Sequence, residues 1–434
     1  MGLSSSLNAG VMGLAVNATK LATISDNIAN SETYGYKRAD TDFTNMVLRQ
    51  GAGAYTAGGV RVATFKDIAS QGALVTTANS TDISIAGRGM LPVTTSAGLT
   101  AQSGDRPLLL TTTGSFSPDQ NGYLRTLSGN FLMGWPAEID GTVNVPGRNS
   151  STGLEPVQIV GNQFIASPTS NVELGLNIPA SATQAGADGA SFDLPVEYFD
   201  SLGRSQTLSF EFIPSVPATG ASNTWTVEVT DQAGDPTTPI ASFDVVFDDA
   251  TGSGGSILSV TPGGGATYDS TTGIVNVNVS SGPISVAIGA PGESGLLTQL
   301  SSSFAPVGVR ADGAPIGSLN AIEINEQGML EAIYDTGFRR VIYQIPLADV
   351  PNVNGLSALD NQTYSVSQAS GDFYFWDAGS GPVGSTIGFS LTESTTDIAE
   401  ELTDLIQTQR AYSSNAKIIQ TVDEMLQETT NLIR

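Results

Sequence analysis

The two ends of the chain carry apolar residues at a seven-residue spacing. This spacing keeps an apolar seam facing a partner helix in a coiled coil. The row near the C-terminus consists of Ile398, Leu405, Tyr412, Ile419, Leu426 and Ile433. The row near the N-terminus consists of Leu7, Leu14, Leu21 and Ile28. A second N-terminal row contains Ile24 and is interrupted by Gly10 and Asn17. The pattern predicts one long helix at each end, which either covers its own domain or pairs with another helix of the same or another molecule.

Capping residues predict where these helices begin and end. We expect the first helix to run from about Ser5 to Ala29, with one of Ser4 to Ser6 as its N-cap. Asp397 is the expected N-cap of the last helix, and Glu400 stands three residues later as in a capping box. That helix should continue to about Asn431.

Between the helices, apolar and polar residues alternate with the two-residue period of half-buried strands. The clearest alternation is found in residues 192–199, 206–212 and 225–229, and residues 200–204 form the expected turn of a hairpin. Similar short segments precede and follow this region. The aromatic run at residues 373–376 predicts a well-buried strand.

The order of helix, β region, acidic β region, β region and helix predicts a nested chain. The expected fold class is α+β, multidomain and elongated, with terminal helices in a coiled-coil layer and antiparallel β domains between them. The predicted parts are a helical domain of 1–32 plus 395–434, a connecting segment of 33–80 plus 370–394, an inner β domain of 81–148 plus 306–369, and an outer acidic β domain of 149–305.

Composition excludes several classes of function. The 434 residues include no cysteine and no histidine, which excludes disulfides, Ser/His/Asp and Cys/His catalysis, and the usual zinc sites. The net charge of -25 argues against binding to nucleic acid. Residues 149–309 hold 15 acidic residues and one arginine, but they contain no calcium-loop motif. We expect no cofactor, no metal and no catalytic site; the enzymatic alternative is a carboxylate-based glycosidase or peptidase.

The chain shows no sign of a membrane-spanning segment. No stretch approaches the roughly 18 apolar residues that a spanning helix needs, and the first cation is Lys20. We expect no membrane insertion, and export without a cleaved signal peptide if the protein is exported.

Two terminal motifs carry a resemblance to a known family. The run from Leu21 to Lys37 resembles the N-terminal signature of flagellar rod and hook proteins, in which N-I-A-N leads to T-x-G-[FY]-K. The C-terminal run from Asp397 to Gln427 is similar to the matching terminal signature, and residues 196–208 resemble the outer-domain hairpin of hook proteins, which favours hook over rod. Gly89-Met90-Leu91 departs from the family's usual G-F-F, and Ser394 to Asp397 departs from S-N-V-D.

The resemblance implies a structural protein that polymerises helically into the flexible tube coupling the flagellar rod to the filament. It implies an extracellular location, terminal helices that line the export channel, and β domains in the outer layers. The implied partners are other copies of this chain, the distal rod, the hook cap, the hook-filament junction and hook-length control proteins, and the flagellar type III export apparatus. The alternative is a distal rod subunit with an inserted outer domain.

The candidate self-assembly residues are those of the two rows and motifs. On the first helix they are Leu7, Leu14, Leu21, Ile24, Asn27, Ile28 and Asn30, and in the turn that follows Thr33, Gly35, Tyr36 and Lys37. On the last helix they are Ile398, Leu402, Leu405, Gln409, Arg410, Tyr412, Asn415, Ile419, Asp423, Met425 and Leu426.

The sequence allows more than one structural role for several of these residues. Asn27 and Asn30 either end the first helix or bond a neighbouring subunit. Gly35 should permit a turn at positive φ. Gln409 and Asp423 either set the register of the seam or face water in the channel. Lys37 and Arg410 could pair with acids of neighbouring subunits.

Overall fold

The computed structural model describes residues 3–46, 58–102, 104–138, 141–159, 165–293 and 295–432. It divides into two compact units. Unit 1 consists of Met1–Gly161, Ala321–Ile333 and Arg339–Arg434, and unit 2 consists of Asn162–Asn320 and Tyr334–Phe338. The four-part division drawn from the sequence stays a prediction.

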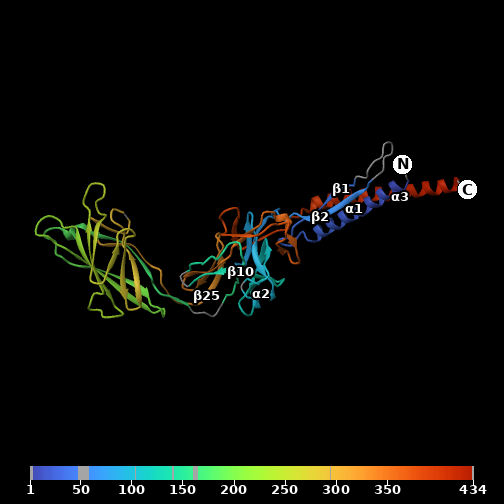
Figure 1. Ribbon diagram of the computed structural model, residues 1–434. Helices are drawn as coiled ribbons and strands as arrows, with labels where there is room; N and C mark the ends of the chain where they lie inside the picture. The colour runs from blue at the N-terminus through green and yellow to red at the C-terminus, as the bar shows by residue number, and fades with distance from the viewer. Residues whose placement is uncertain are drawn as a thin grey trace. The chain divides into compact units, whose positions relative to one another are not determined.

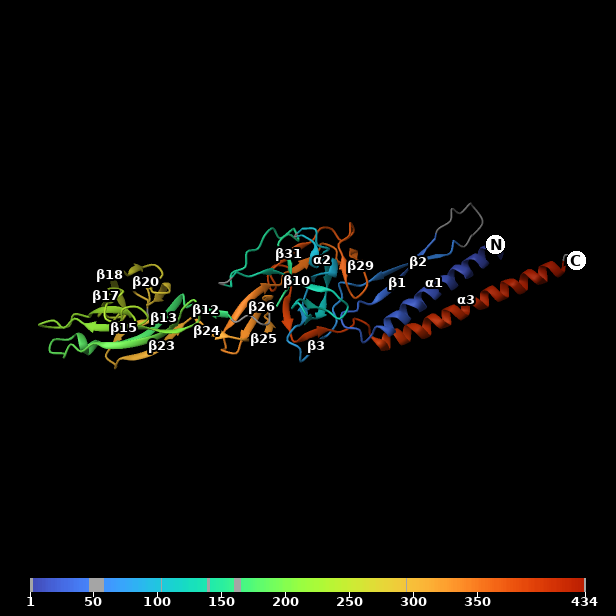
Figure 2. The ribbon, with the colours of Figure 1, turned by 90° about the horizontal axis from the view of Figure 1, so that it is seen from below.

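Two long helices at the ends of the chain lie side by side in unit 1 and run antiparallel (Figures 1 and 2). They are α1 (Leu3–Ala29) and α3 (Ile398–Leu432), and the prediction of two terminal helices is confirmed. The predicted N-cap of α1 is wrong, because the helix is already formed at Leu3 and Ser4 to Ser6 lie within its first turns. Asp397 does cap α3, since its Oδ1 accepts from the backbone N–H groups of Ala399 at 2.8 Å and Glu400 at 3.2 Å. Ile433 lies outside the described residues.

The largest sheet, most of which belongs to unit 1, combines outbound and returning parts of the chain. Its spatial order is β25 (Leu319–Ile324), β26 (Met329–Tyr334), β27 (Arg339–Gln344), β10 (Phe131–Pro136), β5 (Leu91–Thr94), β6 (Leu109–Thr111), β30 (Tyr364–Ser365) and β29 (Ser357–Ala358). Three short strands extend it at β10, namely β11 (Glu155–Pro156), β9 (Leu124–Arg125) and β8 (Ser117–Pro118). Because β10 lies between β27 and β5, the chain is nested as the order of elements predicts.

Smaller elements complete unit 1. The hairpin β1 (Ala39–Asn45) and β2 (Val60–Lys66) contacts α1. The other groups are β3 (Leu74–Thr76) with β33 (Ser390–Thr392), β28 (Leu347–Asp349) with β31 (Tyr374–Trp376), β32 (Ser385–Gly388) with β4 (Asp82–Ala86) and β7 (Thr113–Ser115), and the short helices α2 (Ser96–Thr100) and η2 (Val353–Gly355).

The aromatic strand β31 is only partly buried. Phe375 is fully buried and packs edge-on against Trp135, with ring centroids 6.1 Å apart. Tyr374, in contrast, is 41% exposed. The prediction of a well-buried strand is therefore wrong for Tyr374, because consecutive residues of a strand point to opposite faces and only one face of β31 meets the core.

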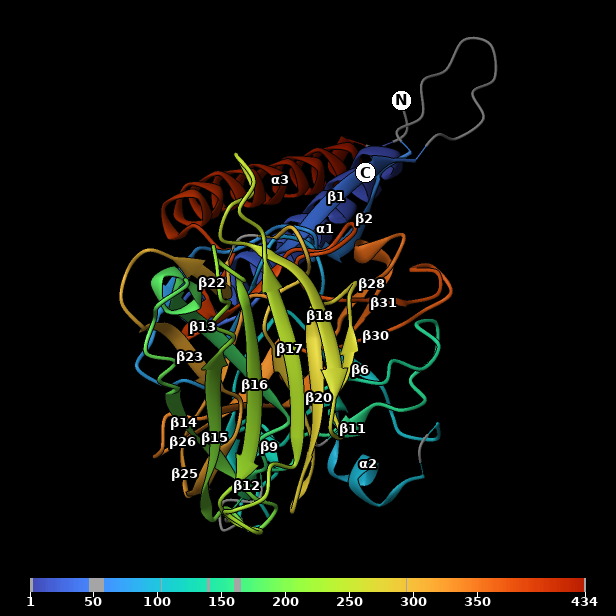
Figure 3. The same ribbon diagram turned by 90° about the vertical axis from the view of Figure 1, so that its left-hand side faces the viewer.

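Unit 2 contains two sheets that face each other across one core. The first follows the order β14 (Phe192–Phe199), β15 (Ser205–Pro214), β16 (Thr224–Asp231), β17 (Ala241–Phe247) and β18 (Ile257–Gly263), most of which Figure 3 shows side by side. The second follows β19 (Thr267–Asp269), β20 (Ile274–Val279), β21 (Gly282–Ala287), β13 (Asn171–Pro179) and β22 (Leu297–Leu300), with β23 (Ala305–Ala311) also paired to β13. Outside these sheets lie β12 (Ile165–Ser167), β24 (Ala314–Gly317) and η1 (Ala180–Thr183).

The core of unit 2 follows from the alternation of its strands. Side chains from both sheets form one buried cluster that includes Trp225, Tyr198, Phe210 and Val275. The second sheet is mixed, because β13 is parallel to β21 and β22. The predicted hairpin is confirmed by the register of β14 and β15. In its turn Asp200 Oδ1 accepts from the backbone N–H groups of Leu202 and Arg204, both at 2.9 Å.

Candidate self-assembly site

The face that α3 turns toward α1 is mainly polar. Its buried side chains are Glu401, Thr408 and Val422, with exposed fractions of 0%, 3% and 6%. Together with half-buried Asn415 they form a row in which each residue is seven positions from the next. Each member of this row lies three positions after a member of the apolar row that starts at Ile398. The buried residues of α1 are Gly10, Val16, Ile24 and Asn27, of which Gly10 lies against Ile419 and Asn27 bonds Glu401.

Two glycines allow α1 to approach α3 closely. A Cβ atom on Gly13 would lie 2.9 Å from Asn415 Oδ1, and one on Gly10 would lie 3.1 Å from Ile419 Cγ1. A larger residue at Gly13 would therefore push the helices apart. Nearer the other end of α1, Lys20 Nζ pairs with Asp404 Oδ2 at 3.2 Å. Gly10, which appears in the sequence as a break in a seam, is a point of helix contact.

Many apolar side chains of α3 are left uncovered by α1. Ile398 and Leu402 are each 47% exposed, and Ile406 is 51% exposed. The others are Tyr412, Ile418, Met425 and Leu426, all more than 40% exposed, although Ile418 also touches α1 at Gly10; Leu405 and Ile419 are half-buried. The expectation that the row from Ile398 faces a partner helix is therefore not met by α1 at Ile398, Tyr412 and Leu426. The apolar surface of α3 is wider than one neighbouring helix can cover.

On α1, most of the predicted row is only partly buried. Leu7, Leu14, Leu21 and Ile28 are half-buried, whereas Ile24 is 2% exposed. The polar residues Gln409, Arg410 and Asp423 of α3 are exposed and lie off the contact with α1. Asp423 Oδ2 accepts a hydrogen bond from Gln427 of its own helix at 3.0 Å.

A buried polar cluster, here called the junction cluster, joins the end of α1 to the start of α3. It consists of Asn27, Tyr36, Arg38 and Glu401. Glu401 Oε1 accepts from Asn27 Nδ2 at 3.0 Å and from Arg38 Nε at 2.5 Å. Asn27 Oδ1 accepts from the Tyr36 hydroxyl at 3.1 Å and from the Ala39 backbone N–H at 2.9 Å, and Asn27 Nδ2 also donates to the Ala39 carbonyl. The hydrogen-bonding groups of the Asn27 side chain are thus all used within the chain. This differs from both interpretations drawn from the sequence, namely that Asn27 ends the helix or bonds a neighbouring subunit.

The remaining motif residues shape the turn after α1. Asn30 Nδ2 donates to the Asp26 carbonyl at 2.9 Å, which fits the helix-ending role, and Thr33 Oγ1 donates to Asn30 Oδ1 at 3.3 Å. Gly35 has φ of +72°, as predicted, and a Cβ there would lie 2.8 Å from Thr113 Cγ2. Burial, together with the hydrogen bond to Asp26, raises the pKa of Tyr36 far above its usual value.

Lys37 lies in the interior instead of at the surface. Its side chain is 3% exposed, and its Nζ donates to the Ser70 carbonyl. Burial lowers the pKa of Lys37 from 10.5 to about 8, although the charge of Asp67 works in the opposite direction. The expectation of an exposed pair at Lys37 is therefore wrong.

This burial predicts a pH dependence. Between pH 8 and 10.5 the unfolded chain holds the Lys37 proton and the folded chain does not, so the contribution of Lys37 to the free energy of unfolding should rise with pH across that window, while the raised pKa of Tyr36 works against it near pH 10. We expect Lys37→Met to raise the free energy of unfolding at pH 7 by about 1–3 kcal/mol and to remove this rise. The measurement is urea unfolding of both proteins from pH 7 to 10.5. A variant that is less stable than the parent at pH 7 would contradict the prediction.

The sequence reasoning misses the residues whose partners are distant in the chain. Neither Glu401 nor Arg38 is singled out from the sequence, yet their side chains meet across 363 positions. No local pattern signals such a pair. Gly10 and Gly13 could have been found, because small residues three apart on a helix indicate close packing.

Within the part of the chain that the structure describes, no group of three or more acidic side chains is placed to hold a metal ion. Among the helices of the same described ranges, none combines the length and apolar character needed to cross a membrane.

Comparisons with known proteins agree with this architecture. Residues 7–37 match a family model described as flagella basal body rod protein, residues 168–314 match the flagellar basal body protein FlaE D2 domain, and residues 389–432 match the flagellar basal body rod FlgEFG protein C-terminal. The chain is 32% identical to the flagellar hook protein of Rhizobium meliloti (strain 1021) and 30% identical to that of Brucella suis biovar 1, with all of both chains covered in each case. It is 27% identical to that of Salmonella typhimurium, over 98% of this chain and all of the relative. This chain belongs to the family of bacterial flagellar hook proteins.

Proposed function

We propose that the apolar side chains of α3 that α1 leaves uncovered form the surface through which hook subunits pack against one another. This chain is a structural subunit of the flagellar hook, and its family is one that self-assembles. The observation that supports the proposal is the separation of the two faces of α3. The polar row of Glu401 and Thr408 is buried against α1, and apolar residues such as Leu402 and Ile406 remain open to a further helix.

The energy available from these residues is sufficient to drive assembly. Fully burying one Leu, Ile or Met side chain contributes roughly 1.5–3 kcal/mol. Six such side chains of the described part of α3, each about half exposed in the single chain, together with Tyr412 would supply several kcal/mol to each contact. Contacts that repeat without closing extend a helical filament.

The alternative of a distal rod subunit is not favoured. Hook proteins match the chain over its full length, and residues 168–314, which make up most of unit 2, match the FlaE D2 domain. We further propose that the chain is not an enzyme, because its family is structural and its sequence lacks histidine and cysteine. The distal rod, hook cap, hook-filament junction proteins, hook-length control proteins and export apparatus are proposed partners on the basis of the family alone.

Charge substitutions on the uncovered surface test the proposal. We expect Leu402→Glu and Ile406→Glu to leave the free energy of unfolding of the monomer within about 0.5 kcal/mol, because both side chains are exposed. We expect each to raise the critical concentration for polymerisation at least tenfold, which corresponds to about 1.4 kcal/mol per contact.

The matched control is Gln407→Glu, which adds the same charge at an exposed polar position of α3 beside Ile406. Sedimentation of the polymer as a function of protein concentration gives the critical concentration of each variant. If all three variants polymerise at the parental concentration, this surface does not mediate assembly.

A further inference from the structure

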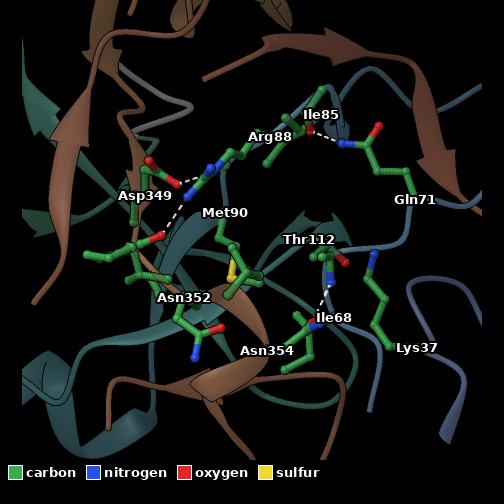
Figure 4. A pocket seen from close by; sticks show the side chains of 18 of the residues that line it. Lys37, Ile68, Gln71, Ile85, Arg88, Met90, Thr112, Asp349, Asn352 and Asn354 are labelled. Carbon is green, nitrogen blue, oxygen red and sulfur yellow. Dashed lines mark hydrogen bonds and ion pairs between the residues drawn. The ribbon is translucent and has the colours of Figure 1, made fainter. Parts of the chain in front are cut away.

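A pocket in unit 1, here called the Lys37 pocket, lies between the segment after α1 and two parts of the inner β region (Figure 4). Its volume is about 320 Å³. Its apolar lining includes Ile68, Ile85, Met90, Leu110 and Val350. This is the size of the smaller cavities that hold small ligands, which usually combine an apolar wall with a few polar groups.

Two of its polar groups lack the partners that burial normally requires. Lys37 Nζ has three protons to donate, and the one acceptor found for it among the described residues is the Ser70 carbonyl. Among the described residues no carboxylate forms an ion pair with this ammonium, and the charge of Asp67 acts on it without a direct contact. Thr112 Oγ1 is also buried and, within the same described ranges, has no hydrogen-bond partner.

The other charged groups of the pocket are already engaged. Arg88 Nε pairs with Asp349 Oδ1 at 2.6 Å, and Arg88 Nη2 donates to the Val350 carbonyl at 2.7 Å. Asp67 lies nearby but bonds Asn354 Nδ2 at 3.4 Å. Among the residues that line the pocket, the charges of Arg88 and Asp349 offset each other and the positive charge of Lys37 remains, while Asp67 acts on Lys37 from outside the lining. A bound anion would supply both a directly bonded counter-ion for Lys37 and an acceptor for the hydroxyl of Thr112.

We propose that the Lys37 pocket binds a carboxylate carried on a short aliphatic body, with the carboxylate on Lys37 and Thr112 and the aliphatic part against Met90 and Leu110. A carboxylate is favoured over a phosphate, because the pocket offers a single free cation and a largely apolar wall. The carboxylate comes either from a free small acid or from an Asp or Glu side chain of a second copy of this chain. The proposal is independent of the assembly surface on α3.

Binding of free acids can be measured at a single lysine. The chain has only four lysines, at 20, 37, 66 and 417, so the ¹³Cε signals of the labelled full-length monomer can be assigned by substitution. We expect n-valerate to shift the Lys37 signal at pH 7 and to raise the pKa of Lys37. Valeramide, which has the same body without the charge, should bind at least tenfold more weakly.

Variants distinguish binding in the Lys37 pocket from a non-specific effect of removing a positive charge. Lys37→Met should abolish the binding of valerate, and Thr112→Val should weaken it severalfold while leaving the cation in place. Lys66→Met is the matched control, because it removes the same charge from a lysine that does not line this pocket. Valerate should bind this control as it binds the parent.

The other possible source of the carboxylate, an Asp or Glu side chain of a second copy of this chain, is tested in the assembled hook. If a neighbouring copy supplies the carboxylate, the pKa of Lys37 should be higher in the polymer than in the monomer, even when free acids do not bind. Lys37→Met should then raise the critical concentration for assembly, and Lys66→Met should not. The proposal is overturned if valerate fails to bind the monomer and the pKa of Lys37 is the same in monomer and polymer.

Discussion

Glu401→Ala should lower the free energy of unfolding of unit 1 by about 3–5 kcal/mol. Glu401 is completely buried, and its carboxylate accepts from both Asn27 and Arg38. Without it the Arg38 guanidinium loses its buried counter-ion and the Asn27 amide loses an acceptor. Because the junction cluster ties the end of α1 to the start of α3, the two helices should also separate more easily.

The neighbouring acid provides a matched control. The side chain of Glu400 is 63% exposed and lies 4.0 Å from Arg38, so Glu400→Ala should change the free energy of unfolding by less than about 1 kcal/mol. Urea unfolding followed by helical circular dichroism measures both variants. Equal losses in the two variants would contradict the role assigned to the junction cluster.

Trp225→Ala should destabilise unit 2 by about 3–5 kcal/mol and leave the unfolding of unit 1 unchanged. Trp225 is fully buried, and its ring centroid lies 5.9 Å from that of Phe192. The indole Nε1 has no hydrogen-bond partner among the described residues, so the loss comes from packing and cavity formation. Unit 2 has its own core between two sheets, and its transition should therefore shift alone.

The control for this substitution is Leu258→Ala on β18. Leu258 is 56% exposed, so its truncation should cost less than about 0.5 kcal/mol. Calorimetry of the full-length monomer should resolve the transitions of the two units. A shift of both transitions by Trp225→Ala would mean that the units unfold as one.

The helices and strands that are signalled by a local sequence pattern could be predicted. The heptad rows predict both terminal helices, and the alternation of residues 192–212 predicts the hairpin β14–β15. Asp397 predicts the start of α3. Each of these signals depends on residues close together in the chain.

The pairing of the helices could not be predicted in the same way. A heptad count finds the most apolar row of α3, but it does not say which partner that row faces. The contact with α1 uses a different row, because Gly10 and Gly13 allow close approach and Asn27 and Arg38 both donate to Oε1 of the buried Glu401. Lys37 was expected at the surface for a related reason, since its burial depends on strands far along the chain.

The polar row and the uncovered apolar residues of α3 make different contacts. The polar row of α3 makes its contacts within the chain, where Asn27 and Arg38 donate to the buried Glu401 carboxylate. The apolar residues that remain uncovered are proposed to meet other copies. Beyond Val422 all described residues up to Asn431 are exposed, so Met425 and Leu426 stand free of the helix pair in the single chain.

Chemical labelling at the uncovered surface tests this central claim most directly. The chain has no cysteine, so Ile406→Cys and Met425→Cys each introduce a unique thiol, and Asp235→Cys places one on an exposed loop of unit 2 as a control. The rate of maleimide labelling is compared between monomer and polymer. We predict that assembly slows labelling at 406 and 425 at least tenfold relative to 235. Equal labelling rates in monomer and polymer at 406 and 425 would contradict the claim that these apolar residues are the assembly surface.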